Sequence, residues 1–359
     1  MKIYIFIISF LFFIRYFFRK NIISLRQIYY VIFLALFLFS TFRFHVGCDW
    51  HGYYYMYLKV AKFDLLQVIS SKDPLSFLMF YLVSKTGLPY PYINIPFGII
   101  FFTGIHLLAK RQPDPLSFLI LLFPILIINM PMSGLRQAAS IGFICIAFTA
   151  FLDRHPFRFL LLVLIATGFH SSAIVFLILF PFATGYHNNT RLAIAVFLSV
   201  PGLIMITYLE TVQIAAKNYI GSGLEAYGGL FRLGILILTG FYFLFFVKNK
   251  WKQAFPKDYA LVNLGAIGMI IIFFILPVSS VIGDRFGYYL IPIQAMIFAR
   301  IPYLQFRSLH LFHTIIPYFG IFLLFLIWAT ISYNFQKCYI PYDTWIFGIF
   351  NREMLRFYI

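Results

Sequence analysis

The sequence predicts an all-α polytopic membrane protein with about 10–12 transmembrane helices plus re-entrant or interfacial helices. Composition is the first observation behind this prediction. Of the 359 residues, 62% are hydrophobic and only 11% are charged, whereas soluble domains carry about 25% charged residues. The mean hydropathy is +0.90, and the apolar residues fall into runs close to the ~20 residues that cross a bilayer. We expect a single polytopic membrane domain over residues 1–359.

Basic residues set the expected orientation of these runs. The formal charge is +17, and most lysines and arginines lie in short loops, which is typical of cytoplasmic loops rather than of a nucleic-acid surface. No nucleic-acid partner is therefore expected. No cleavage site of small residues follows the first run, so we expect it to be retained. The runs expected to cross the membrane are 3–18, 28–42, 91–109, 116–129, 141–152, 192–209, 230–247, 259–277, 288–299 and 309–331.

The run 157–183 does not fit a simple crossing. The basic loop that begins at Lys248 is expected in the cytoplasm, and counting back from it places both ends of this run on that same side. A helix broken within 167–172 resolves the count, because irregular backbone is tolerated at depth where it lines a cavity or is buried in protein. A miscounted span is the alternative.

Three segments are expected on the outer side of the membrane: 43–91, 210–229 and 332–359. The part 74–83 of the first segment is apolar but too short to span, so it predicts a re-entrant or interfacial helix. Cys48 and Cys338 fall in the first and last segments, where an oxidising compartment would allow a disulfide between them. Cys145 lies inside a span and is interpreted as a small buried residue.

A polar stretch over residues 130–140 lies between two apolar runs. Read as a helix starting near Ser133, it places Ser133, Arg136, Gln137 and Ser140 at i, i+3, i+4 and i+7, on one face. A charged residue in the bilayer costs about 2.5–3.5 kcal/mol, so it normally faces a wet cavity or a partner. The first hypothesis is therefore a cationic cavity that binds an anionic ligand.

Four arginines are expected on the outer side, where cytoplasmic-loop statistics do not account for them. Guanidinium groups bind phosphate and carboxylate through a planar fork of donors. We expect Arg43 and Arg136 to contact the ligand. For Arg285 a ligand contact and a pairing with the adjacent Asp284 both stay open, and Arg232 is interpreted as a residue at the end of a span.

Candidate bases are Asp49 and His170, since an inverting glycosyl transfer needs a carboxylate or imidazole to remove the proton of the acceptor hydroxyl. The tyrosines at 53–57, 90 and 92 predict either a carbohydrate-stacking surface or an interfacial aromatic belt. The sequence contains no phosphate-binding loop, metalloprotease motif or dinucleotide fingerprint. No cofactor and no metal are therefore expected.

Four short stretches in this order resemble the EpsG family of Wzy-like polysaccharide polymerases. They are Arg43-Phe44-His45-Val46-Gly47-Cys48-Asp49 with the tyrosines that follow, Gly134-Leu135-Arg136-Gln137, Phe169-His170-Ser171-Ser172-Ala173 and Arg285-Phe286-Gly287-Tyr288-Tyr289. Trp50 departs from the family pattern. The resemblance implies a GT-C-like glycosyltransferase of the bacterial inner (cytoplasmic) membrane. Such enzymes transfer a glycan from undecaprenyl pyrophosphate onto the next lipid-linked repeat unit at the periplasmic face, forming O-antigen, capsule or exopolysaccharide.

The resemblance also implies roles for individual residues. Arg136, with Arg43 and Arg285, would hold the pyrophosphate and stabilise its charge as it leaves. Asp49 or His170 would act as the base. Further residues expected to contact substrate are Gln137, Tyr288 and Tyr289. The expected partners are the lipid-linked oligosaccharide and membrane lipids, with a chain-length regulator protein as a further candidate.

Other classes of membrane protein remain open. A flippase for the same lipid-linked oligosaccharide predicts internal repeats, and no clear repeat is present. An O-antigen ligase or a membrane O-acyltransferase would use a similar anion site with a different acceptor. Purified protein supplied with lipid-linked repeat units alone separates these classes by whether it forms a ladder.

Overall fold

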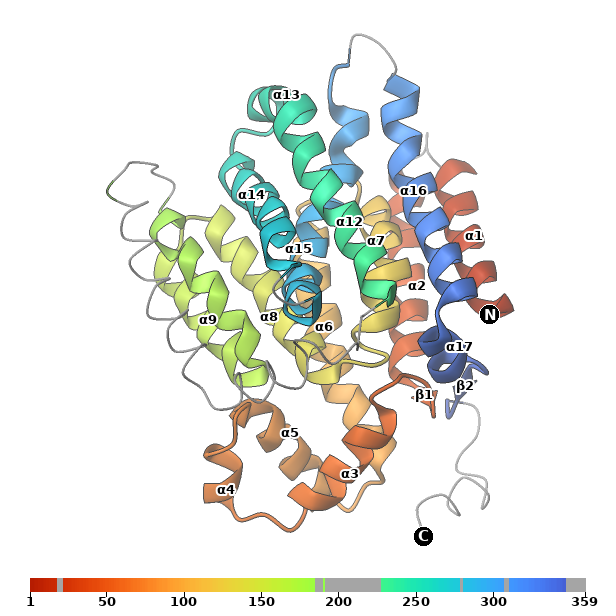
Figure 1. Cartoon of the computed structure of the whole chain (residues 1–359), viewed down its shortest axis with the longest axis vertical. Coiled ribbons are helices and arrows are strands. Elements are labelled where there is room, and N and C mark those ends of the chain that lie inside the picture. Colours follow the sequence, from red (N-terminus) through yellow and green to blue (C-terminus); the bar gives the residue numbers. More distant parts are fainter. Residues whose placement is uncertain (18–21, 185–189, 191–226, 278–279, 307–309, 347–359) are drawn as a thin grey trace.

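The computed structural model describes residues 1–17, 22–184, 190, 227–277, 280–306 and 310–346 (Figure 1). Helices run side by side along the long axis of the molecule, and a smaller group of helices covers one end. Within these described residues, four helices are long and apolar enough to cross a membrane, and six shorter apolar helices accompany them. The chain is therefore an all-α polytopic membrane protein, as its composition predicted.

The helices and strands follow one another in this order: α1 (Lys2–Phe17), α2 (Ile22–Thr41), β1 (Arg43–Phe44), α3 (Trp50–Val60), α4 (Leu65–Ile69), α5 (Pro74–Lys85), η1 (Tyr90–Ile93), α6 (Asn94–Ala109), α7 (Pro115–Leu122), η2 (Phe123–Ile127), α8 (Leu135–Leu152), α9 (Pro156–Phe169), η3 (Ser171–Phe182), α12 (Tyr227–Tyr242), η4 (Phe243–Val247), α13 (Lys248–Ala254), α14 (Tyr259–Ile275), α15 (Ser280–Arg300), η5 (Ile301–Tyr303), α16 (His310–Ile331), α17 (Tyr333–Tyr339) and β2 (Asp343–Thr344). The predicted span 192–209 and most of the predicted loop 210–229 lie outside the described residues.

Helix α8 is the centre of the bundle. It packs most extensively against α6 and α9, and glycines allow its backbone to approach α6 closely. A Cβ added at Gly104 would lie only 2.0 Å from the carbonyl oxygen of Gly142, so the two helices touch through their backbones, as small residues permit in membrane bundles. The polar start of α8 is therefore surrounded by protein.

One end of the bundle gathers positive charge, and we name it the lysine end. It contains α13, with Lys248, Lys250 and Lys252. Arg300, at the end of α15, lies against Trp251 of α13 and pairs with Asp258 at the start of α14. Two further ion pairs, Arg15–Asp114 at 2.6 Å and Arg111–Asp153 at 2.5 Å, join loops to neighbouring helices. Such a concentration of lysine and arginine is typical of a cytoplasmic face.

The opposite end is closed by α3, α4 and α5, and we name it the disulfide end (Figure 1). The short helix expected over 74–83 is confirmed as α5. These helices share a second apolar core with residues such as Trp50, Phe80 and Phe169. Tyr53 and Tyr90 are buried in that core at 7% and 1% exposure, so an exposed carbohydrate-stacking role for these two tyrosines is wrong.

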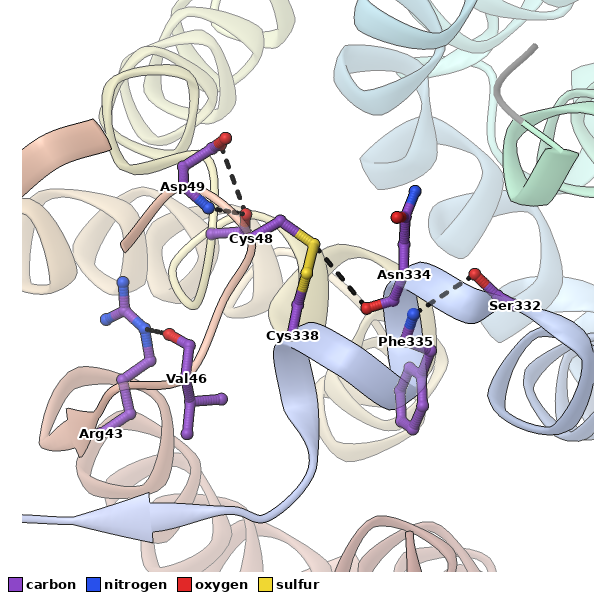
Figure 2. Close-up of a disulfide and its surroundings, with 9 residues drawn as sticks. Arg43, Val46, Cys48, Asp49, Ser332, Asn334, Phe335 and Cys338 are labelled. Atoms are coloured by element: carbon purple, nitrogen blue, oxygen red, sulfur yellow. Dashed lines mark hydrogen bonds between the residues drawn. A yellow bond between two sulfur atoms is a disulfide. The ribbon is translucent and has the colours of Figure 1, made fainter. Parts of the chain in front are cut away.

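A disulfide ties this end together. Cys48 and Cys338, 290 residues apart, are bonded as the sequence suggested (Figure 2). The main-chain N–H of Gly47 donates to the carbonyl of Cys338 at 2.7 Å, and β1 pairs antiparallel with β2. The loop after α2 and the described part of the predicted tail therefore form one unit.

The predicted break within 167–172 is confirmed. Helix α9 ends at Phe169, His170 has extended backbone, and η3 starts at Ser171 and packs beside α9. Side chains of the disulfide end form hydrogen bonds with the interrupted backbone. Ser76 Oγ donates to Phe169 O at 2.7 Å, and Ser171 N donates to Asp73 Oδ1 at 2.9 Å. The break thus lies against the disulfide end and is buried in protein, where irregular backbone is tolerated.

Two predicted helix starts differ from the structure. Helix α8 begins at Leu135 rather than near Ser133, because Gly134 occupies the position before the first turn. Helix α15 begins at Ser280, so residues 280–287, which precede the predicted span 288–299, are helical and not part of a loop. Its Gly287 lies where a Cβ would be 2.8 Å from Leu233, which lets α15 pack closely on α12.

Candidate functional site

The four stretches that resemble the EpsG family are brought together near the disulfide end. The stretch 43–49 contacts the turn before α8 through three hydrogen bonds. Arg43 Nε donates to Met132 O at 2.6 Å. Ser133 Oγ accepts the main-chain N–H of Asp49 and donates to Asp49 Oδ2, both at 3.3 Å. Segments far apart in the sequence therefore meet at the start of α8.

The start of α8 is also bonded to α15, which lies much later in the sequence. Gln137 Nε2 donates to the carbonyl oxygen of Arg285 at 2.6 Å. The stretch 169–173 meets α15, the helix that carries Arg285, because Ser172 Oγ lies 3.1 Å from the hydroxyl of Tyr289. We define the cluster formed by Asp49, Asp73, Arg136, Gln137, His170, Ser172, Arg285 and Tyr289 as the polar cluster.

Arg136 is held in the polar cluster by Asp73, an acid of the disulfide end. Its Nη1 lies 2.6 Å from Asp73 Oδ2, and the two side chains are 28% and 3% exposed. The same carboxylate accepts the N–H of Ser171, next to His170. Asp73 precedes α5 but does not cap it with its side chain, because both oxygens are directed at these partners. One carboxylate therefore fixes the cation relative to the break in the α9–η3 helix pair.

The guanidinium of Arg136 retains unused donor capacity. Its Nε is buried and has no hydrogen-bond partner among the described residues. The ring of Tyr53 lies 6.0 Å from Cζ. Burial, reinforced by the charge of Asp49, raises the pKa of the Tyr53 phenol, so this hydroxyl stays protonated. A partly exposed guanidinium whose Nε has no partner in the described part of the chain, at a helix N-terminus, is suited to an anionic oxygen.

His170 belongs to a chain of hydroxyl groups. Its Nδ1 lies 2.6 Å from Ser172 Oγ, which in turn contacts Tyr289 Oη. Tyr289 donates to Ser140 Oγ at 2.9 Å, and Ser140 donates to the carbonyl of Ala166 at 2.9 Å. Tyr289 is 0% exposed, so its hydroxyl faces this chain rather than an open surface. The expected substrate contact of Tyr289 is replaced by a structural link to His170.

Arg43 has a different environment from the one expected. It is 0% exposed, and its guanidinium donates to three carbonyls, those of Val46, Met132 and Ser40, with the Trp50 ring 5.5 Å from Cζ. Figure 2 shows the bond to Val46. These bonds hold the loop that leads into α8. The placement removes Arg43 from the cations that reach a bound phosphate in this conformation, and it acts on the site only through the loop.

The remaining arginines also differ from each other. Arg232 pairs with Asp284 through several bonds, the shortest at 2.6 Å, and covers the ring of Tyr288 at 4.6 Å. Asp284 is therefore the partner of Arg232 and not of Arg285, and the 6% exposed Tyr288 packs under that pair. Arg285 is exposed, and no ion-pair partner for it lies in the described part of the chain. It remains a cation available to a ligand.

Both candidate bases interact electrostatically with the guanidinium of Arg136. Asp49 is exposed and acts electrostatically on Arg136, and the charges of Arg136 and Arg285 both act on the imidazole of His170. Within the described residues, no group of three His, Cys, Asp or Glu side chains is arranged to hold a metal ion. The available chemistry is therefore anion binding by guanidinium and amide groups beside an imidazole and a carboxylate.

Sequence reasoning missed Asp73 and Ser172 as members of this cluster. Asp73 carried one signal, because acids are rare in this chain, with 11 Asp and Glu among 359 residues. Ser172 stood in a stretch that resembles the family, but a serine beside an apolar helix more often bonds its own backbone.

The fold and the polar cluster define a polytopic membrane protein with a group of arginine, acidic and histidine side chains near one end of its helix bundle. The chain belongs to the EpsG family, whose model matches residues 26–344. Membership suggests a polysaccharide-polymerase-like function. No match was found among curated proteins or among solved structures.

Proposed function

We propose that this protein is a Wzy-type polymerase of the bacterial inner membrane. It would transfer a glycan from undecaprenyl pyrophosphate onto a lipid-linked repeat unit at the periplasmic face, making O-antigen or an exopolysaccharide. The observation that carries the proposal is the environment of Arg136, a partly exposed guanidinium with spare donors beside His170 and Arg285. Family membership supports the same reaction class.

The orientation follows from the two ends of the bundle. The disulfide between Cys48 and Cys338 requires an oxidising compartment such as the periplasm. The lysine end has the charge expected of a cytoplasmic face. The polar cluster is bonded to the loop 43–49, which carries Cys48, and this supports a location of the cluster on the periplasmic side.

The proposed reaction breaks the bond between the anomeric carbon of the donor glycan and its diphosphate oxygen. The acceptor hydroxyl oxygen attacks that carbon, and the bonding electron pair leaves with undecaprenyl pyrophosphate. Arg136 and Arg285 would offset the charge that develops on the diphosphate, and Gln137, which bonds the Arg285 carbonyl, would hold their helices in register. The polyprenyl diphosphate supplies the driving force, so no nucleotide is required.

A reconstitution experiment tests the proposal. Wild-type protein in liposomes, supplied only with lipid-linked repeat units, should form a ladder of longer lipid-linked glycans. Arg136→Ala should lower the rate about 10²–10³-fold, the usual effect of removing one donor to a developing oxyanion. Arg136→Lys should recover little activity, because an ammonium lacks the planar fork. The matched control is Arg158→Ala, which removes an exposed cation at the start of α9.

Full activity of Arg136→Ala would contradict the assigned role. Product formed only when lipid A core is present would identify an O-antigen ligase, and transbilayer movement without a covalent product would identify a flippase. Either result overturns the polymerase reaction.

A further inference from the structure

The hydroxyl chain that ends at His170 has a fixed direction. A carbonyl oxygen only accepts hydrogen bonds, and each hydroxyl has one proton to donate. Ser140 uses its proton on the carbonyl of Ala166, and Tyr289 uses its proton on Ser140. The contact between Ser172 and Tyr289, at 3.1 Å, then has only the Ser172 proton available. Ser172 therefore donates to Tyr289.

This direction determines the protonation of the imidazole. Since Ser172 has spent its proton on Tyr289, the 2.6 Å contact between His170 Nδ1 and Ser172 Oγ requires a proton on Nδ1. A neutral imidazole carries its single proton on one nitrogen, so Nε2 has the free lone pair. Within the described residues Nε2 has no hydrogen-bond partner, and His170 is only partly buried.

One contact opposes this assignment. The main-chain N–H of Ser172 also points at His170 Nδ1, at 3.4 Å, and would favour an unprotonated Nδ1. This contact is longer than each of the side-chain hydrogen bonds that connect His170, Ser172, Tyr289 and Ser140. An unprotonated Nδ1 would take the Ser172 proton and leave two oxygen lone pairs facing each other between Ser172 and Tyr289. The tautomer with Nδ1–H satisfies every side-chain contact, so we prefer it.

We propose that Tyr289, acting through Ser172, is a positioning residue that fixes the His170 proton on Nδ1 and makes Nε2 the proton acceptor of the reaction. This inference rests on the proposed function and chooses His170 over Asp49 as the base. Nε2 takes the proton of the acceptor hydroxyl as its oxygen bonds to the anomeric carbon. The departing electron pair goes to undecaprenyl pyrophosphate, and the proton on Nε2 is then released to solvent.

Positive charge surrounds the imidazole. Arg136 on α8, Arg285 on α15 and Lys72 before α5 all act on His170, and Asp73 bonds the neighbouring Ser171 N–H. Burial first, and then these cations, keep the imidazole neutral before the reaction.

The first test reads the tautomer without using activity. Protein labelled with 15N-histidine in lipid is measured by solid-state NMR, and His170→Asn identifies the His170 resonances by their loss. Wild-type protein should show a protonated Nδ1. In Tyr289→Phe the Ser172 hydroxyl loses its acceptor and turns to Nδ1, so the proton should move to Nε2. A protonated Nε2 in the wild-type protein, or the same tautomer in both proteins, overturns the proposal.

The second test measures turnover in the reconstituted system. Tyr289→Phe should lower kcat by about 10²-fold or more, the typical contribution of general base catalysis, with KM for the lipid-linked unit little changed. Ser172→Ala should do the same from a partly exposed position, and Ser172→Thr, which keeps the hydroxyl, should restore most of the rate. The matched control is Tyr242→Phe, which removes a tyrosine hydroxyl from His313 at 3.0 Å.

Normal kcat in both Tyr289→Phe and Ser172→Ala overturns the proposal even if both proteins fold. If the wild-type protein forms no ladder, the proposed function fails and the base assignment falls with it. In that case the spectra still decide the tautomer by themselves.

Discussion

Replacing Asp73 by asparagine should release Arg136 and destabilise the disulfide end. The carboxylate accepts Arg136 Nη1 at 2.6 Å and the N–H of Ser171 at 2.9 Å, and its side chain is 3% exposed. Breaking a buried ion pair costs about 3–5 kcal/mol. The cost is smaller here because Arg136 is 28% exposed and asparagine keeps an acceptor for Ser171. We expect a loss of about 2–3 kcal/mol in the free energy of unfolding.

The assay is unfolding of purified protein by denaturing detergent in mixed micelles, followed by circular dichroism. Asp64→Asn is the matched control: it removes an exposed acid from the same segment, and asparagine caps α4 as well as aspartate does. A double-mutant cycle with Arg136→Gln should give a coupling energy of about 1–3 kcal/mol. If Asp73→Asn is as stable as the control and the coupling is below about 0.5 kcal/mol, the ion pair does not hold Arg136.

Three further predictions concern stability. Replacing Cys48 and Cys338 together by serine removes a cross-link between residues 290 positions apart, which should lower the free energy of unfolding by at most about 5–6 kcal/mol through chain entropy. Proteolytically nicked wild-type protein should run as one species on non-reducing gels and as two after reduction. Two species without reductant would refute the disulfide. Gly47→Ala should destabilise the protein strongly, because φ is +107° and the new Cβ would lie 1.8 Å from the carbonyl oxygen of Met132. Gly52→Ala has open space around it and should leave the free energy of unfolding unchanged or raise it by up to about 1 kcal/mol. Equal melting temperatures of the two variants would contradict this. A hydrogen bond from Arg111 lowers the pKa of the Asp153 carboxyl. The stabilisation by this pair is therefore present above the unfolded-state pKa of Asp153 and is lost as pH falls through the folded-state pKa. Thermal scans should show that the stability of Asp153→Asn falls less at acid pH than that of the wild type.

Sequence patterns predicted the broken helix correctly because charge placement constrains the number of crossings. Counting back from the basic loop at Lys248 placed both ends of the run 157–183 on one side, and the polar residues around His170 marked where it could turn. Helix α5 was predictable for a similar reason, since an apolar segment of its length cannot span a bilayer. The start of α15 was not predictable, because close packing at Gly287 against α12 extends the helix through a polar stretch.

The arginines show where such reasoning stops. Arg43, Arg136 and Arg285 share the same chemistry and the same expected side of the membrane. A ligand contact was expected for the first two and was one of two alternatives for Arg285. In the structure, carbonyls surround the first, an acid holds the second and the third is exposed. Each outcome depends on which remote group the fold brings within 3 Å.

By itself, the amino-acid sequence determined the class of this protein, because span length and charge placement are properties of contiguous residues. It also marked the stretches that form the polar cluster. Only the tertiary structure decided their roles, since Arg136 meets an acid 63 residues away and Ser172 meets a hydroxyl 117 residues away. Hydrogen bonds act over about 3 Å, so no pattern along the chain specifies which partner lies at that distance.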